Sequence, residues 1–165
     1  MERLDWDSYF MNIVFLVAMR SKDLSTHHGA VIVAPGNQII ATGYNGLPRL
    51  VLDIDGSRRE RPAKYIWTEH SERNALYQAA RRGIATEGCR LYVSGIPCPD
   101  CARGIIQCGL KEVVIDKIGT DNTPSHWREA VACSLQMFKE AMINVRYWTG
   151  TLVMPVRFLD GKILE

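Results

Sequence analysis

Short apolar runs alternate along the chain with stretches in which apolar residues recur every three or four positions. Runs rich in Val, Ile and Tyr predict β-strands, and the longer spacing predicts helices that bury one face. Glycines or a Pro-Gly-Asn turn end several of these stretches. We expect strands at residues 29–34, 38–44, 90–94, 112–116 and 144–148, with room for one more in the tail, and helices at residues 5–21, 69–82, 100–108 and 125–141.

The order of these elements predicts an α/β fold. A helix comes first, a hairpin of two strands follows, and helices and strands then alternate to residue 148. Three β-α-β units favour parallel strands with helices on both faces, which leaves the opening hairpin as the single antiparallel pair. Residues 45–66 lack periodicity and are predicted to form a long loop. Residues 1–165 suit one hydrophobic core, so we expect a single domain.

Composition and charge argue against several classes of protein. Lys and Arg number 20 and Asp and Glu 18, so the net charge of +2 does not favour binding to a nucleic-acid polymer. Five cysteines cannot all pair within one chain, which favours a reducing compartment. The apolar run at residues 10–19 is too short to span a bilayer, and acidic residues precede it. These features predict a cytoplasmic protein without membrane contact.

Two short motifs carry the chemistry of a metal site. His70-Ser71-Glu72 opens one predicted helix, and Cys98 and Cys101 lie three positions apart at the start of another. One imidazole and two thiolates form a ligand set suited to Zn²⁺. A helix N-terminus stabilises negative charge, which helps both sulfurs to remain thiolates. We expect one zinc ion per chain on His70, Cys98 and Cys101, with a buried or redox-active cysteine pair as the alternative.

A fourth protein ligand would make this site structural, whereas an open position would make it catalytic. Cys108 lies too far along its helix, and Cys89 is expected at the opposite end of the intervening strand. Cys133 is on another helix, where we expect it to be buried as a small apolar residue. His126 remains an alternative ligand. The spacing favours three ligands and an open position.

Glu72 is the predicted catalytic residue. It follows His70 by two positions, and residues so spaced do not share a helix face, so we do not expect it to bind the same ion. Its carboxylate can instead reach a water molecule beside the metal and act as a general acid and base. The alternative is an exposed glutamate stabilised by the helix dipole.

His70-Ser71-Glu72 and Pro97-Cys98-Pro99-Asp100-Cys101 match the H-x-E and P-C-x-x-C signature of zinc nucleobase deaminases. With Gly29–Val33, Gly43–Pro48 and Glu72–Ala75, the chain resembles the deoxycytidylate (dCMP) deaminase branch of the cytidine deaminase-like superfamily over most of residues 28–116. The resemblance implies a three-layer α/β/α sandwich around a five-stranded mixed sheet. It also implies hydrolysis of dCMP to dUMP and ammonia, with Glu72 carrying protons to N3 and to the leaving amine.

The resemblance further implies where a nucleotide binds. Asn45 is expected to contact the sugar. The residues expected to line the base pocket are Ala30, Ser94, Gly95, Ile96 and Pro97. Trp127, at the start of a predicted helix, is a further candidate for contact with the base, and core packing is its alternative role.

Three features of this sequence depart from the family pattern. Ser71 stands where Ala is usual between the His and the Glu, and the change is small enough to fit. His27 and His28 precede Gly29 in place of apolar or basic residues, so the wall of the pocket there is open to question. The long loop lacks the Cys and His that form a second, structural zinc site in some relatives, which supports a single metal.

Basic residues of the long loop offer partners for a phosphate. The candidate phosphate-binding residues are Arg49, Arg58, Arg59 and Arg61, with Lys64 close behind them in sequence. Any one of them could equally be a solvated charge balanced by acidic residues of the loop. As a group they favour a nucleotide over a nucleoside.

Other functions remain open at this point. A deaminase of tRNA adenosine, of another nucleobase such as guanine, or of a free nucleoside would use the same zinc motif, and a zinc-stabilised binding module would not turn over substrate. Family members are often homo-oligomers, commonly hexamers, activated by dCTP and inhibited by dTTP. The resemblance therefore implies a homo-oligomer, a hexamer or smaller, and these two candidate effectors.

Overall fold

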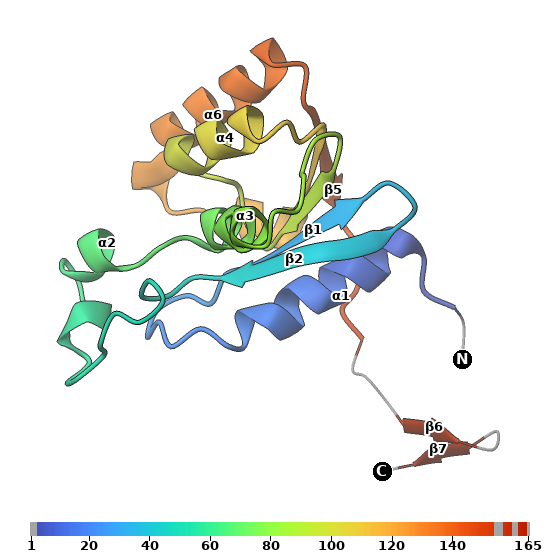
Figure 1. Cartoon of the computed structure of the whole chain (residues 1–165), viewed down its shortest axis with the longest axis horizontal. Coiled ribbons are helices and arrows are strands. Elements are labelled where there is room, and N and C mark those ends of the chain that lie inside the picture. The colour runs from blue at the N-terminus through green and yellow to red at the C-terminus, as the bar shows by residue number, and fades with distance from the viewer. Residues whose placement is uncertain (1–2, 154–156, 160–161, 165) are drawn as a thin grey trace.

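The computed structural model describes residues 3–153, 157–159 and 162–164. A five-stranded sheet with the strand order β2-β1-β3-β4-β5 forms its centre, and helices cover both faces of this sheet (Figure 1). Its strands are β1 (Gly29–Ala34), β2 (Gln38–Tyr44), β3 (Arg90–Val93), β4 (Glu112–Asp116) and β5 (Asn144–Trp148). The helices are α1 (Trp6–Ala18), α2 (Lys64–Trp67), α3 (Ser71–Arg81), α4 (Pro99–Gln107), α5 (Lys117–Asp121) and α6 (Arg128–Glu140), with 3₁₀ turns η1 (Ser57–Arg59) and η2 (Ser125–Trp127).

Both faces of the sheet are buried because alternate residues of each strand belong to different layers. In β1, Val31 and Val33 pack in the cluster formed with α1, whereas Ala30 and Ile32 pack in the cluster formed with α3, α4 and α6. The neighbouring strands β3 and β4 divide their apolar residues between the same two clusters. The predicted three-layer α/β/α sandwich is confirmed, with α1 alone on one face.

The strand directions confirm one part of the predicted topology and correct another. β3, β4 and β5 are mutually parallel, as the β-α-β units indicate. The hairpin of β1 and β2 is antiparallel, but β1 also pairs antiparallel with β3, so the expectation of a single antiparallel pair was wrong. The chain leaves β2, passes through α3 and enters β3 on the far side of β1. β1 therefore runs against both of its neighbours.

Two further segments differ from the predicted elements. The long loop between β2 and α3 (residues 45–70, here the β2–α3 loop) contains the short elements η1 and α2. The tail forms not one strand but two, β6 (Arg157–Leu159) and β7 (Lys162–Leu164), which pair with each other in a separate sheet. Among the residues that the structure describes, no helix is long and apolar enough to cross a membrane.

Candidate active site

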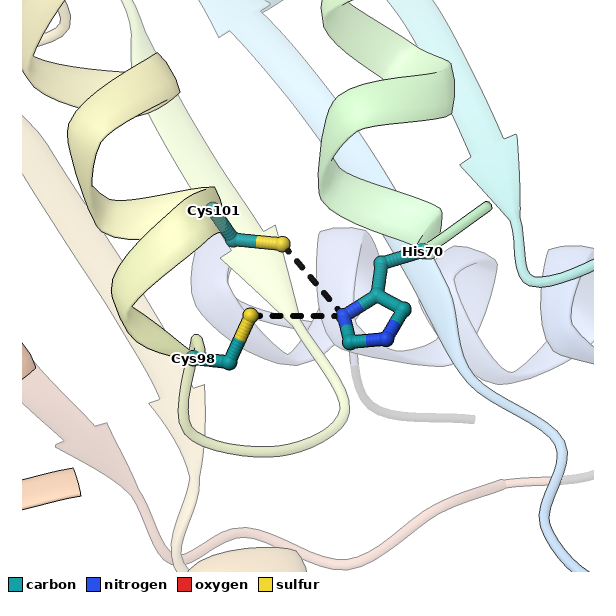
Figure 2. Close-up of side chains that lie close together, drawn as sticks. All are labelled: His70, Cys98 and Cys101. Carbon is teal, nitrogen blue, oxygen red and sulfur yellow. Dashed lines mark hydrogen bonds between the residues drawn. The ribbon is translucent and has the colours of Figure 1, made fainter. Parts of the chain in front are cut away.

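Three side chains from the beginnings of two helices converge on one point. His70 is the N-cap of α3, Cys98 is the N-cap of α4, and Cys101 lies in the first turn of α4. The His70 Nδ1 atom is 3.5 Å from the Sγ atoms of both Cys98 and Cys101 (Figure 2). The three donor atoms all lie within 4.8 Å of one another. One ring nitrogen and two sulfurs at this spacing fit the donor set and the compact geometry of a zinc site.

The packing of α3 against the sheet fixes the position of His70. A side chain at Gly43 of β2 would have its Cβ atom 2.2 Å from the Ser71 carbonyl oxygen, so glycine lets the first turn of α3 lie directly on the sheet. The Gly46 and Glu69 backbones exchange two hydrogen bonds of 3.0 and 2.8 Å. This bridge closes the base of the β2–α3 loop immediately before His70, so the length of the loop does not displace the ligand.

The electrostatics of the cluster favour a thiolate. Donation by the Cys101 thiol and by the His70 ring outweighs the effect of burial and lowers the pKa of Cys98 to about 4. The same pairing, together with burial, raises the pKa of Cys101. Hydrogen bonding to Cys98 raises the pKa of His70 against the opposing effect of burial. A divalent cation would stabilise the second thiolate, because each sulfur would then face a positive charge.

Glu72 lies beside this cluster without belonging to it. The metal-binding group found among the described residues contains His70, Cys98 and Cys101 and does not include a carboxylate. Glu72 is buried, with a relative exposure of 6%, and its Oε2 atom accepts a 2.8 Å hydrogen bond from the Ser71 hydroxyl. The predicted alternative of an exposed first-turn glutamate is therefore wrong. The serine that departs from the family pattern contacts this carboxylate directly.

The other cysteines and His126 do not join the three ligands in the described part of the chain. Cys89 is buried near the start of β3 and Cys108 is half-buried at the end of α4. Cys133 is exposed, which contradicts the prediction that it is buried. The helix α6 buries Ser134 and Phe138 instead, so Cys133 lies on the face turned away from the core.

A cavity of about 870 Å³ opens onto Glu72 and two of the three ligands, His70 and Cys98. His70, Glu72 and Cys98 line it together with two other sets of residues. The polar set includes Asp23, Thr26, His27, Asn45, Arg61 and Lys64, and the apolar set includes Phe15, Ile118, Trp127, Val131, Trp148 and Leu152. A volume of this size is ample for a nucleotide.

The structure places most of the predicted substrate-binding residues at this cavity. Asn45, Ser94, Gly95, Ile96 and Trp127 line it. Two other predicted residues, Ala30 and Pro97, are buried and are not part of the lining. The Ala30 side chain packs in the core between the sheet and α3, so its methyl group does not reach the cavity.

Asn45 also holds the adjacent wall in place. Its Oδ1 atom accepts a 2.8 Å hydrogen bond from the His28 backbone N–H, and its Nδ2 atom donates to the Thr26 carbonyl at 3.0 Å. Asn45 has a relative exposure of 6%. One N–H and one lone pair of its amide remain for a ligand.

The loop cations separate into different environments. Arg61 lines the cavity, whereas Arg49 is exposed and lies outside the lining. Arg58 lies 4.0 Å above the Trp67 ring and donates to a loop carbonyl at 2.7 Å. Arg59 pairs with Asp53 at 3.2 Å. Of the four predicted phosphate-binding arginines, the structure brings Arg61 to the cavity.

Sequence reasoning missed an ion pair in the cavity wall. Lys64 donates to both Asp23 carboxylate oxygens, at 2.9 and 2.8 Å, and to the Ser25 hydroxyl at 2.6 Å. Burial raises the pKa of Asp23, but hydrogen bonds from Lys64, Ser25 and Thr26 outweigh it and hold the value at about 2. No signal in the sequence pairs a lysine with an aspartate that lies so far away along the chain.

His28 is a second cavity residue whose place could not be predicted. Its ring is half-buried and its Nδ1 atom lies 3.1 Å from the Ser94 hydroxyl. Burial lowers the pKa of His28, while the nearby Glu72 charge opposes this effect. The one signal in the sequence was that a histidine stands before Gly29, where the family usually has an apolar or basic residue.

Comparison with known proteins decides the family of the chain. The model of the "Cytidine and deoxycytidylate deaminase zinc-binding region" matches residues 4–117. The chain belongs to this zinc-binding deaminase family. A family relative named "Uncharacterized deaminase in luxG 3'region" from Aliivibrio fischeri is 39% identical over 142 residues, which cover 86% of this chain and 92% of the relative. The deoxycytidylate deaminase of Mus musculus is 36% identical over 153 residues, 88% of this chain and 81% of the mouse protein.

Two solved structures show the same fold. The dCMP deaminase of the cyanophage S-TIM5 superposes with a TM-score of 0.69 at 21% identity, covering 89% of this chain and all of the phage chain. The deaminase/reductase of Thermotoga maritima has a TM-score of 0.61 at 24% identity and covers 86% of this chain and 36% of the other. At these identities the likeness concerns the fold. The family membership of this chain rests on the sequence comparisons.

Proposed function

We propose that this protein is a zinc-dependent deoxycytidylate deaminase that hydrolyses dCMP to dUMP and ammonia. The observation that carries the proposal is a buried carboxylate, Glu72, beside a three-residue zinc site at the wall of a cavity large enough for a nucleotide. The choice of dCMP is supported by relatives that carry the name deoxycytidylate deaminase, including the mouse protein and the human protein, which is 39% identical over 116 residues.

The three ligands fit zinc by their chemistry. His70 supplies a neutral ring nitrogen and Cys98 and Cys101 supply two thiolates, while the described residues add no fourth donor to the group. This leaves a coordination position for water, the arrangement of a catalytic site. When bound there, zinc supplies Lewis acidity that makes water a better nucleophile near neutral pH.

Glu72 performs the proton transfers in this proposal. Deamination forms a C4–O bond, breaks the C4–N4 bond and releases the amine as ammonia. Glu72 accepts a proton from water during the attack on C4 and places it on N3. It then takes the remaining proton of the new C4 hydroxyl and delivers it to the amine, which leaves as ammonia while the C4 carbonyl forms. The Ser71 hydroxyl holds one carboxylate oxygen, Oε2, and so limits the rotation of the carboxylate.

Arg61 is the candidate partner for the 5′-phosphate. It lines the cavity, and no ion pair to it is found among the described residues, whereas Lys64 in the same lining is neutralised by Asp23. A guanidinium can bind a phosphate through two parallel N–H donors. Binding energy from the phosphate would orient the base against Glu72, so the nucleotide should exceed the nucleoside in turnover as well as in affinity.

Ammonia release from a panel of substrates tests this function. The zinc-loaded protein should deaminate dCMP far faster than deoxycytidine, cytosine, guanine or adenosine. Faster reaction with guanine, or with a tRNA added to the panel, would assign the protein to another class of deaminase. An equal kcat/KM for dCMP and deoxycytidine would overturn the nucleotide assignment. Zinc binding without any ammonia release would support the alternative of a non-catalytic binding module.

Four finer statements belong to the same proposal. We place residues 1–165 in one deaminase domain, supported by the pairing of β5 with β4 beyond the region matched by the family model. We place the protein in the cytoplasm, on its free cysteines. A homo-oligomer, a hexamer or smaller, is supported by the exposed apolar side chains Trp6, Tyr9 and Leu16 on α1. The fourth statement is that dCTP activates the enzyme and dTTP inhibits it. The molar mass in solution tests the homo-oligomer, and reaction rates in the presence of each nucleotide test the regulation.

A further inference from the structure

The cavity wall just before β1 and just after β3 holds one histidine ring, that of His28, in a fixed position. The His28 backbone N–H donates to Asn45 Oδ1 at 2.8 Å, and the ring Nδ1 atom lies 3.1 Å from Ser94 Oγ. A Cβ atom at Gly95 would approach the ring to 3.2 Å, so the ring lies against the Gly95 backbone. Three neighbours therefore restrain His28 in the absence of any ligand.

The hydrogen bonds of Ser94 decide which ring nitrogen carries the proton. Ser94 Oγ accepts the Gly29 backbone N–H at 3.1 Å, and its own proton can go to His28 Nδ1 at 3.1 Å or to the Gly29 carbonyl at 3.5 Å. The first contact is within ordinary hydrogen-bond distance and the second is at its limit. The shorter contact favours Nδ1 as the acceptor, and in that tautomer the neutral ring carries its proton on Nε2.

The Nε2–H group has no hydrogen-bond partner in the part of the chain that the structure describes. Among residues 3–153, the hydrogen bond of the His28 ring is the one through Nδ1. His28 lines the same cavity as Glu72 and Asn45, and it is not part of the zinc-binding group. A restrained donor without a partner at a cavity wall is suited to an acceptor on a bound ligand, because a buried polar group gains most when it is paired.

We infer that His28 is a specificity-determining residue that donates its Nε2–H to an oxygen of the nucleoside part of the substrate. The acceptor is either the 2-carbonyl of the base or the 3′-oxygen of the sugar. The identity of the nucleotide in this inference rests on the proposed function, whereas the position of the His28 ring comes from the contacts described above. Ser94 acts through His28 as a positioning residue, since its hydroxyl holds the ring by Nδ1.

Two amide variants separate the two ring nitrogens. In His28→Asn the side-chain amide reaches about as far as Nδ1 and can keep the contact with Ser94, but it loses the donor at the Nε2 position. In His28→Gln the amide reaches about as far as Nε2 and can keep the donor. We expect kcat/KM for dCMP to fall about 10- to 100-fold in His28→Asn and less than about threefold in His28→Gln.

Zinc content and melting temperature accompany these kinetics as measures of folding. An equal loss in the two variants, or no loss in either, would overturn the role of Nε2. Nitrogen NMR of the zinc-loaded wild-type protein, with the His28 signals assigned by their absence in the variants, should place the proton on Nε2. A proton on Nδ1 would overturn the assignment as a donor.

A substrate analogue identifies the acceptor oxygen. If the loss in His28→Asn is as large for 2′,3′-dideoxy-CMP as for dCMP, the acceptor is the base carbonyl; if the loss disappears, it is the 3′-oxygen. Failure of the wild-type protein to release ammonia from dCMP would refute the proposed function alone. The same two variants are then compared by calorimetric binding of dUMP, in which weaker binding by His28→Asn alone would still support the inference, and equal binding would refute it.

Discussion

The zinc site and the β2–α3 loop line one cavity but are held in place by different means. His70 and the two cysteines begin helices that pack on the central strands, and Cys101 is fully buried. The loop buries little and instead exposes large apolar side chains, with Leu50 at 94% and Ile66 at 86% exposure. Its fixed points include the Gly46–Glu69 bridge, the Arg59–Asp53 and Lys64–Asp23 ion pairs and a stacked arginine.

Because the two regions are held differently, we expect substitutions in them to change different properties of the protein. The zinc ligands depend on the core, so their loss should affect metal content and stability together. The loop depends on individual polar contacts, so its variants should change substrate preference or local stability while zinc stays bound.

The largest effect should follow removal of a zinc ligand. Cys101→Ser replaces a buried thiolate with a hydroxyl, which is a poor zinc ligand at neutral pH. We expect the variant to lose most of its zinc, to lose activity by more than about 10³-fold, and to melt at a lower temperature, because metal binding contributes to folding. Metal analysis and calorimetry measure these losses.

The matched control is Cys133→Ser, which makes the same change at an exposed position outside the site. It should keep wild-type zinc content, activity and melting temperature. Full zinc content in Cys101→Ser would disprove the three-ligand site, and zinc loss in Cys133→Ser would assign the metal to other residues.

The next largest effect concerns the ion pair that ties the loop to the segment before β1. Lys64→Met leaves the Asp23 carboxylate buried without its cation, at a position where the Asp23 side chain is 5% exposed. We expect the free energy of unfolding to fall by about 3 kcal/mol. Zinc content should remain unchanged. Urea unfolding monitored together with metal content tests this prediction.

The same variant has a defined pH dependence. The pKa of Asp23 is lowered to about 2 in the folded protein, below its ordinary value, so its pairing stabilises the protein at neutral pH and this contribution is lost as the pH falls towards about 2. The difference in stability between wild type and Lys64→Met should therefore narrow from about pH 4 downward. Acid removes zinc from both proteins, so the effect of zinc loss on the free energy of unfolding cancels in the difference between them. A difference that widened in acid would rule out the pairing.

The smallest effect should be a change of preference. Arg61→Gln removes the cavity-lining cation, so kcat/KM for dCMP should fall about tenfold while that for deoxycytidine stays constant. Arg49→Gln removes an exposed loop charge outside the lining and serves as the control. Equal effects of the two changes on dCMP would show that the loop acts through its overall charge, and no effect of Arg61→Gln would place the phosphate elsewhere.

The zinc site was predictable because its signal is local. The H-x-E spacing places His70 at the start of one helix, and the C-x-x-C spacing places both cysteines at the start of another. The α/β order that the apolar pattern also predicts brings His70 to the cysteines. The layers of the sandwich follow from the same pattern. The antiparallel pairing of β1 with β3 does not, because periodicity says which residues are buried and not which strands lie side by side.

The environment of individual side chains was harder to predict for a related reason. Arg58 looked available to a phosphate, but it stacks on Trp67, and this contact depends on how the loop folds back on itself. Cys133 looked suited to the core, but α6 turns Ser134 and Phe138 inward instead. Both cases concern the direction in which a side chain points, which the apolar pattern alone does not specify.

The central claim is that Glu72 moves protons beside a zinc site that does not use it as a ligand. Glu72→Gln keeps the side-chain length and a hydrogen-bonding end but cannot accept a proton. Ammonia release from dCMP by the zinc-loaded variant tests the claim most directly. The account predicts wild-type zinc content with a rate lower by about 10²–10⁴-fold or more. Loss of zinc would make Glu72 a ligand, and full activity with zinc bound would assign the proton transfers to another group.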